Sequence, residues 1–125
     1  MTRISHALLA GAFSYGEYRS HIDRLLQKGK TTGENHTEQM LEYTRLNVHR
    51  MSRIDRTVKL TAGTKQLLAG LDRDLVWLVL TEAWCGDAAQ NVPVLSMMAD
   101  AAPRVTLRLL LRDAHLDIMD RYLTN

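Results

Sequence analysis

Cys85 is the single cysteine of the chain and the residue best suited to chemistry. It follows an apolar run at residues 75–81 and opens a stretch with helical periodicity, 85–101, so it lies where a helix begins. The free backbone N–H groups and the dipole at a helix N-terminus favour a thiolate. Because only the thiolate attacks a disulfide, this placement predicts thiol–disulfide chemistry.

The segment around Cys85 resembles the active site of the thioredoxin family. Trp84-Cys85-Gly86 is similar to the start of that family's W-C-G-x-C site. Pro93, eight residues after Cys85, is similar to the proline that kinks the family's active-site helix, and a proline inside a helix is otherwise disfavoured. The resemblance covers residues 60–125 and implies a thioredoxin-like fold with Cys85 as the nucleophile.

Two features of the family's pattern are missing. The position of the second cysteine, which in the family attacks the mixed disulfide, is occupied by Ala88, so resolution requires an external thiol. The only prolines are Pro93 and Pro103, and neither matches the family's cis-proline on a later strand. The fold is therefore expected to lack the closing β-hairpin and the final helix, either by truncation or as a shortened relative.

Each motif residue also has a purely structural interpretation. Cys85 is either a redox nucleophile or an unreactive small residue. The second interpretation is supported by Glu82 and Asp87, which lie close in sequence and would oppose a thiolate. Asp87 either tunes the thiol or receives its proton, or it only complements the helix dipole as an acidic residue of the first turn. Trp84 either shapes the partner-binding surface or packs beside the helix, and Pro93 is expected to be structural.

Composition excludes several classes of protein. The 125 residues are 46% hydrophobic and 24% charged, as in an ordinary globular domain. The longest apolar run, at residues 75–80, is far too short for a membrane span. A single cysteine excludes an internal disulfide and favours a reducing compartment. We interpret the faintly signal-like start, residues 1–13, as part of a cytoplasmic protein.

Charged and metal-ligating residues give no second site. None of the five histidines forms a pair with metal-ligand spacing, so no metal and no cofactor are expected. A basic stripe formed by Arg45, His49, Arg53 and Arg56 shares its helix face with Glu38. Since the net charge is only +2, a solvated face is favoured over a nucleic-acid site. We expect no nucleic-acid partner and no membrane partner.

The elements that position Cys85 follow from capping and periodicity. Ser14-x-x-Glu17 predicts a capping box, with Phe13 and Tyr18 as a hydrophobic staple, and Gly29 predicts the end of that helix. A second helix is predicted to start by the same logic at Asn35-x-x-Glu38. Its expected apolar face contains the residues Met40, Tyr43, Met51 and Ile54, with Thr44 and Asn47 between them.

Shorter elements are predicted in the second half of the chain. A helix is expected over 62–69, strands over 75–81 and 105–111, and a last helix over 114–123. The connection between the strands is long enough for a right-handed crossover, so the strands should be parallel. An open sheet edge predicts self-association.

The predicted fold class is α/β: a thioredoxin-like strand-helix-strand unit over 61–125, preceded by a helical extension over 1–60, together forming one structural unit. The leading functional hypothesis is thiol–disulfide exchange or redox homeostasis, with protein or low-molecular-weight thiols and disulfides as partners. The alternative is a non-catalytic thioredoxin-fold module that binds proteins through its helical N-terminal part.

Overall fold

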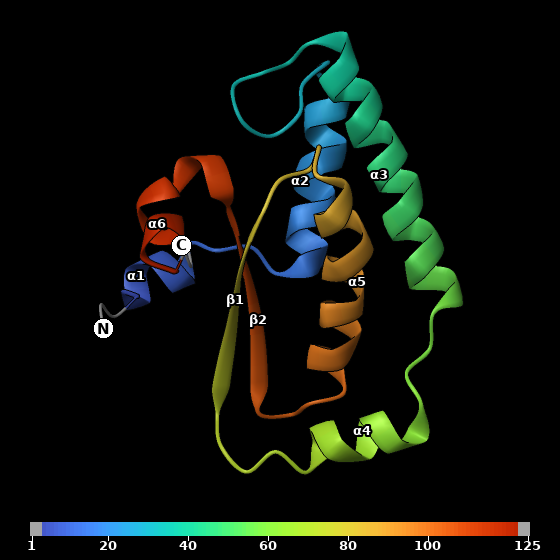
Figure 1. Cartoon of the computed structure of the whole chain (residues 1–125), viewed down its shortest axis with the longest axis vertical. Helices are drawn as coiled ribbons and strands as arrows, with labels where there is room; N and C mark the ends of the chain where they lie inside the picture. The colour runs from blue at the N-terminus through green and yellow to red at the C-terminus, as the bar shows by residue number, and fades with distance from the viewer. Residues whose placement is uncertain (1–3, 123–125) are drawn as a thin grey trace.

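A two-stranded parallel sheet forms the centre of the computed structural model, which describes residues 4–122 (Figure 1). Strand β1 (Leu75–Thr81) pairs with β2 (Val105–Leu111), and helix α5 (Gly86–Asp100) connects them. The strand bounds and the parallel pairing are confirmed. Helices cover both faces of the sheet, which agrees with the continuous apolar run of residues 75–80 in β1, whereas β2 also contains Thr106 and Arg108.

Helices α2 (Tyr15–Gln27), α3 (Glu38–Thr57) and α5 lie on one face of the sheet (Figure 1). The main core contains alternate strand residues together with side chains of all three helices, among them Tyr18, Ile22, Met51, Val92, Leu107 and Leu109. Helix α4 (Ala62–Ala69) lies near the end of the sheet where the strands begin, and it packs Leu68 against Ala102 and Val105. One core therefore joins the helical N-terminal part to the strand-helix-strand unit.

The opposite face of the sheet is covered by two short helices, α1 (His6–Ala10) and α6 (Leu116–Tyr122). Leu110 and Ile118 are buried there, and Leu8 packs against them. A short 3-10 helix, η1 (Arg112–Ala114), joins β2 to α6, so the expected last helix starts two residues later than predicted. Helix α1 was not predicted, because its five residues are too few to show a helical period.

Several helices begin and end where their capping residues predict. Ser14 and Glu17 form the capping box at the start of α2, and the Phe13 and Tyr18 rings lie 6.3 Å apart. Gly29 follows the helix with φ of +69°, a conformation that suits glycine. The predicted start of α3 was wrong by two residues. Thr37 is its N-cap, whereas the Asn35 side chain accepts a hydrogen bond from the Thr37 N–H at 3.1 Å.

The inward face of α3 differs from the prediction in a way that matters for the site. Its buried residues are Leu41, Thr44, Asn47 and Met51, while Tyr43 is exposed. Two polar side chains thus lie inside the protein on this helix. Buried polar groups need hydrogen-bond partners, so Thr44 and Asn47 indicate polar contacts with other segments.

The two sheet edges are only partly covered within residues 4–122. Phe13 and Leu109 form an isolated antiparallel bridge on the outer edge of β2, with two N–H···O bonds of 2.8 Å. No strand in the described part of the chain pairs with the outer edge of β1, and no hairpin follows β2 there. In the same residues, no helix has the length and apolar character needed to cross a membrane.

Candidate functional site

Cys85 lies at the carboxyl end of β1, directly before the first turn of α5. It is the N-cap residue of that helix, with an extended backbone (φ −87°, ψ 118°), and its thiol is free and half-buried. The thiol makes no capping hydrogen bond to the helix. The sequence prediction that Cys85 lies at a helix N-terminus is therefore confirmed. The residue directly precedes the unpaired N–H groups of a 15-residue helix.

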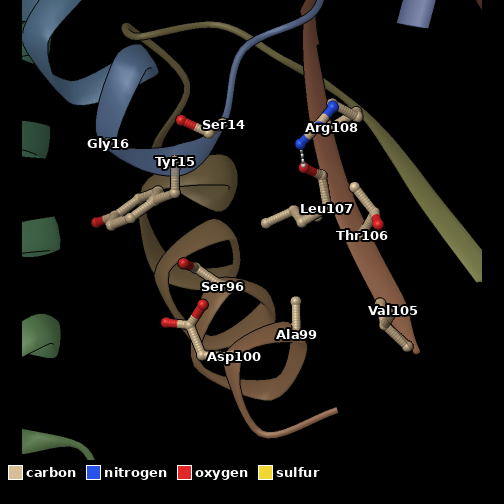
Figure 2. Close-up of a pocket in the computed structure, with 10 residues that line it drawn as sticks. All are labelled: Ser14, Tyr15, Gly16, Ser96, Ala99, Asp100, Val105, Thr106, Leu107 and Arg108. Atoms are coloured by element: carbon tan, nitrogen blue, oxygen red, sulfur yellow. Dashed lines mark hydrogen bonds between the residues drawn. The ribbon is translucent and has the colours of Figure 1, made fainter. Parts of the chain in front are cut away.

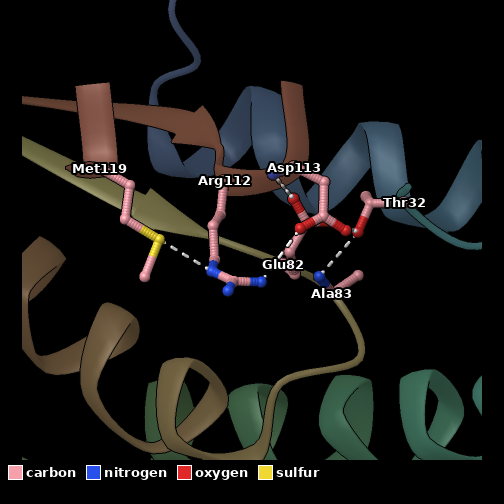
Figure 3. Close-up of polar contacts among 6 residues, drawn as sticks. All are labelled: Thr32, Glu82, Ala83, Arg112, Asp113 and Met119. Carbon is pink, nitrogen blue, oxygen red and sulfur yellow. Dashed lines mark hydrogen bonds and ion pairs between the residues drawn. The ribbon is translucent and has the colours of Figure 1, made fainter. Parts of the chain in front are cut away.

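The turn that leads to Cys85 is held by a set of contacts that we call the polar clamp: the side chains of Thr32, Asn47 and Glu82 around the backbone of Ala83. The Thr32 hydroxyl accepts from the Ala83 N–H at 2.9 Å and donates to Glu82 Oε1 at 2.6 Å (Figure 3). Asn47 Nδ2 donates to the Ala83 carbonyl at 3.0 Å. Both backbone groups of this buried residue are thus bonded to side chains from distant segments.

Glu82 is a buried carboxylate, only 2% exposed. Besides Thr32, it accepts a hydrogen bond from the backbone N–H of Asp113 in η1 at 3.1 Å (Figure 3). The neighbouring Arg112 lies between Met119 Sδ and Asp113 Oδ1, at 3.0 and 3.1 Å. The Glu82 carboxylate therefore links the β1–α5 turn to the loop before α3 and to the segment after β2.

A cation from α3 lies beside the residue that follows Cys85. Arg50 Nη1 is 3.2 Å from the point where a Cβ atom on Gly86 would lie. The same nitrogen donates to Asn47 Oδ1 at 3.0 Å, and no acidic side chain among residues 4–122 forms an ion pair with Arg50. Arg50 therefore places a positive charge beside Gly86, the first residue of α5.

The other motif residues lie where the sequence predicts. Trp84 is half-buried beside Cys85, Asp87 is exposed in the first turn of α5, and Ala88 packs partly against the core. Pro93 is buried inside α5, farther along the same helix. The structure thus gathers residues 84–88 at one end of the sheet and places Pro93 away from the thiol.

Tyr18 is a buried residue of α2, and its hydroxyl lies 3.0 Å from Thr81 Oγ1 at the end of β1. Burial raises the pKa of Tyr18 to about 12, and the negative charges of Glu82 and Cys85 add to this effect. The phenol therefore keeps its proton at neutral pH, and it shares a hydrogen bond with the Thr81 hydroxyl in which either oxygen can donate. The sequence indicated only the staple role of this side chain.

Sequence reasoning missed three residues of the site: Thr32, Asn47 and Arg50. A signal existed for Asn47, because an amide on the apolar side of a predicted helix indicates a buried hydrogen bond. Thr32 gave no signal, since the stretch 30–33 has the composition of an ordinary polar loop. Its contact with Glu82 joins residues 50 positions apart.

A separate pocket of about 400 Å³ lies along β2, away from the cysteine (Figure 2). It lies between the start of α2, the later turns of α5 and residues 105–108, and none of residues 82–93 lines it. Within residues 4–122 no group of three or more His, Cys, Asp or Glu side chains is placed to hold a metal ion.

A family model described as thioredoxin matches residues 33–125 of the sequence. The chain belongs to the thioredoxin family. In this thioredoxin-family chain the match begins well before residue 60, so it includes α3 with Asn47 and Arg50, which the sequence resemblance did not cover. Searches of curated proteins and of solved structures returned no significant match. The α/β fold class is confirmed.

Proposed function

We propose that this thioredoxin-family chain takes part in thiol–disulfide exchange or redox homeostasis, with Cys85 as its single nucleophile. The observation that carries the proposal is the free thiol of Cys85 at the N-cap of α5, in a Trp84-Cys85-Gly86 segment that resembles the start of the family's active site. The Arg50 cation beside Gly86 supports it. The partners are protein or low-molecular-weight thiols and disulfides.

The reaction proceeds by two kinds of exchange. The Cys85 thiolate attacks one sulfur of a substrate disulfide, forming a mixed disulfide as the substrate S–S bond breaks, and the leaving thiolate takes a proton from solvent. An external thiolate then attacks the Cys85 sulfur and releases the second substrate thiol. A further external thiol regenerates Cys85, so two external thiols become one disulfide while the substrate disulfide is reduced to two thiols.

Adduct formation by Cys85 tests the proposal. We expect the parent chain to form a mixed disulfide with glutathione disulfide and Cys85→Ser to form none, as measured by intact mass. Reduction of insulin disulfides should depend on added glutathione, because Ala88 cannot release the substrate. Robust turnover without any external thiol would contradict the mechanism, and the absence of an adduct in the parent would contradict the function.

The alternative is a non-catalytic thioredoxin-fold module that binds other proteins. Two exposed apolar side chains on α3, Tyr43 and Leu46, favour this reading, since they lie on the face turned away from the core. The alkylation rate of Cys85 separates the two functions. A rate at neutral pH well above that of an unstructured cysteine peptide supports exchange chemistry, and an equal or lower rate supports the module.

A further inference from the structure

Thr32 makes contacts that a loop threonine with no function would not need. It is 2% exposed, and its hydroxyl joins the Glu82 carboxylate to the Ala83 amide two residues before Cys85 (Figure 3). A hydroxyl has one proton to give and can also accept. Because Glu82 takes the proton, the oxygen of Thr32 is turned toward the Ala83 N–H.

The preceding residue, Thr31, provides a natural comparison. It is equally buried, at 1% exposed, but its hydroxyl is bonded to Thr44 Oγ1 at 2.6 Å on α3 and not to the turn before Cys85. Thr44 in turn donates to the Met40 carbonyl at 2.8 Å. The two adjacent threonines thus connect the same loop to different parts of the protein.

Gly33 brings the loop close to the cysteine turn on the other side. Its backbone has φ of +80°, and a Cβ atom there would lie 3.1 Å from Asp113 Oδ2 and 3.7 Å from the Trp84 indole nitrogen. The loop therefore runs directly against Trp84, the residue before Cys85. Its position and that of the turn are coupled by contact as well as by the hydrogen bonds of Thr32.

We propose that Thr32 is the positioning residue of Cys85: its hydroxyl, oriented by the buried carboxylate of Glu82, fixes the turn that sets the thiol at the start of α5. This inference rests on the proposed exchange function. Without the hydroxyl, the buried Ala83 N–H and Glu82 Oε1 lose a partner, and the turn shifts to find others. A small displacement of a reacting group is enough to slow its chemistry.

Matched variants at the two threonines test the inference. Thr32→Val removes the hydroxyl at nearly constant shape, Thr32→Ser keeps it, and Thr31→Val removes the neighbouring hydroxyl. The rate of Cys85 reaction with an uncharged dipyridyl disulfide is measured beside urea unfolding for each protein. We expect Thr32→Val to lower the rate about tenfold or more. Thr32→Ser should retain the parent rate, as should Thr31→Val despite a comparable loss of stability.

Amide hydrogen exchange of Ala83 supplies a readout that does not depend on reactivity. We expect exchange at Ala83 to be faster in Thr32→Val than in the parent and unchanged in Thr31→Val, with shifted amide resonances for Cys85 and Gly86 only in the former. Equal rates and equal exchange in the two valine variants, or failure of Thr32→Ser to retain the parent behaviour, would overturn the inference. If Thr32→Val does not fold, Thr32→Ala takes its place.

The two proposals can fail separately. A parent protein that forms no adduct at Cys85 overturns the exchange function, and the Ala83 exchange and the Cys85 resonances then decide whether Thr32 positions the turn. A reactive parent whose rate and resonances are insensitive to Thr32→Val keeps the exchange function and overturns the role of Thr32.

Discussion

Ala88 is the residue that separates this chain from a dithiol enzyme. It lies three residues after the N-cap Cys85, and residues at this spacing share one face of a helix. We expect Ala88→Cys to form an internal disulfide with Cys85 on mild oxidation and to reduce insulin without glutathione. Thiol counting before and after oxidation measures formation of the disulfide, with Ala88→Ser as the control. Two free thiols after oxidation would contradict the geometry.

Tyr18 gives a prediction about stability at high pH. The pKa of its phenol is raised to about 12 in the folded protein, chiefly by burial. The unfolded chain loses this proton near the ordinary pKa of about 10, so the folded state binds more protons between these values and stability falls as pH rises. We expect the fall to reach about 1.4 kcal/mol per pH unit over this range.

Tyr18→Phe should lack that part of the pH dependence. Urea unfolding of the parent and the variant between pH 9 and about 11.5 measures the difference, which should be constant below pH 10 and shrink above it. Tyr43→Phe, on an exposed ring, should follow the parent. A parent and a Tyr18→Phe variant with parallel curves would show that burial of this phenol has no such effect.

Strands and helices with a clear local pattern could be predicted from the sequence, whereas contacts between distant segments could not. Strand β1 is an almost uninterrupted apolar run and β2 is rich in β-branched and aliphatic residues, so the bounds of both strands follow from the sequence. The ends of α2 follow from the Ser14–Glu17 box and Gly29. The loop before α3 had no period to interpret, and its burial depends on Glu82, far along the chain, so the polar clamp became visible only in three dimensions.

Helix α3 contributes charge to the start of α5, and this can be tested at Arg50. Removing the cation near Gly86 should slow the reaction of Cys85 with an uncharged disulfide, because the thiolate then loses a nearby positive charge that would stabilise it. We expect Arg50→Met to lower the rate about threefold, or roughly 0.6 kcal/mol, at low salt, with a smaller effect at high salt.

Two variants serve as references for this measurement. Arg50→Lys keeps a charge and should lie between the parent and Arg50→Met. Arg53→Met removes an exposed cation farther along α3 and should leave the rate unchanged. Equal rates for Arg50→Met and Arg53→Met would show that the cation at position 50 does not act on the thiol.

The whole molecule has one sheet edge, the outer edge of β1, with which no strand of the described residues pairs. On the sheet face next to this edge, an apolar groove of about 400 Å³ is lined by Val76, Leu78, Leu80, Ile118 and two further residues, and Val76 is 52% exposed. The outer edge of β2 is better protected: Phe13 pairs with it, and the Arg108 guanidinium covers the Leu107 carbonyl at 3.0 Å (Figure 2). Self-association should therefore use the β1 edge.

Lysine substitutions on the two strands test this asymmetry. We expect light scattering of the parent at high concentration to give a mass above that of one chain, and Val76→Lys to return the mass of a single chain, because a charge on an edge strand opposes pairing. Thr106→Lys, at the paired position of β2, should behave as the parent. A parent that stays at the mass of one chain at every concentration would refute self-association.

The bridge between Phe13 and Leu109 also determines when the segment around Phe13 can fold onto the sheet during synthesis of the chain. Phe13 leaves the ribosome long before Leu109, and translation of the segment between them takes on the order of 5–20 s. Helix α2 can form meanwhile, since its capping box is local. The segment before it cannot dock until β2 has emerged and paired with β1. In a nascent chain halted before residue 105, protease should therefore cleave within residues 4–13, whereas release of the full chain should protect this segment.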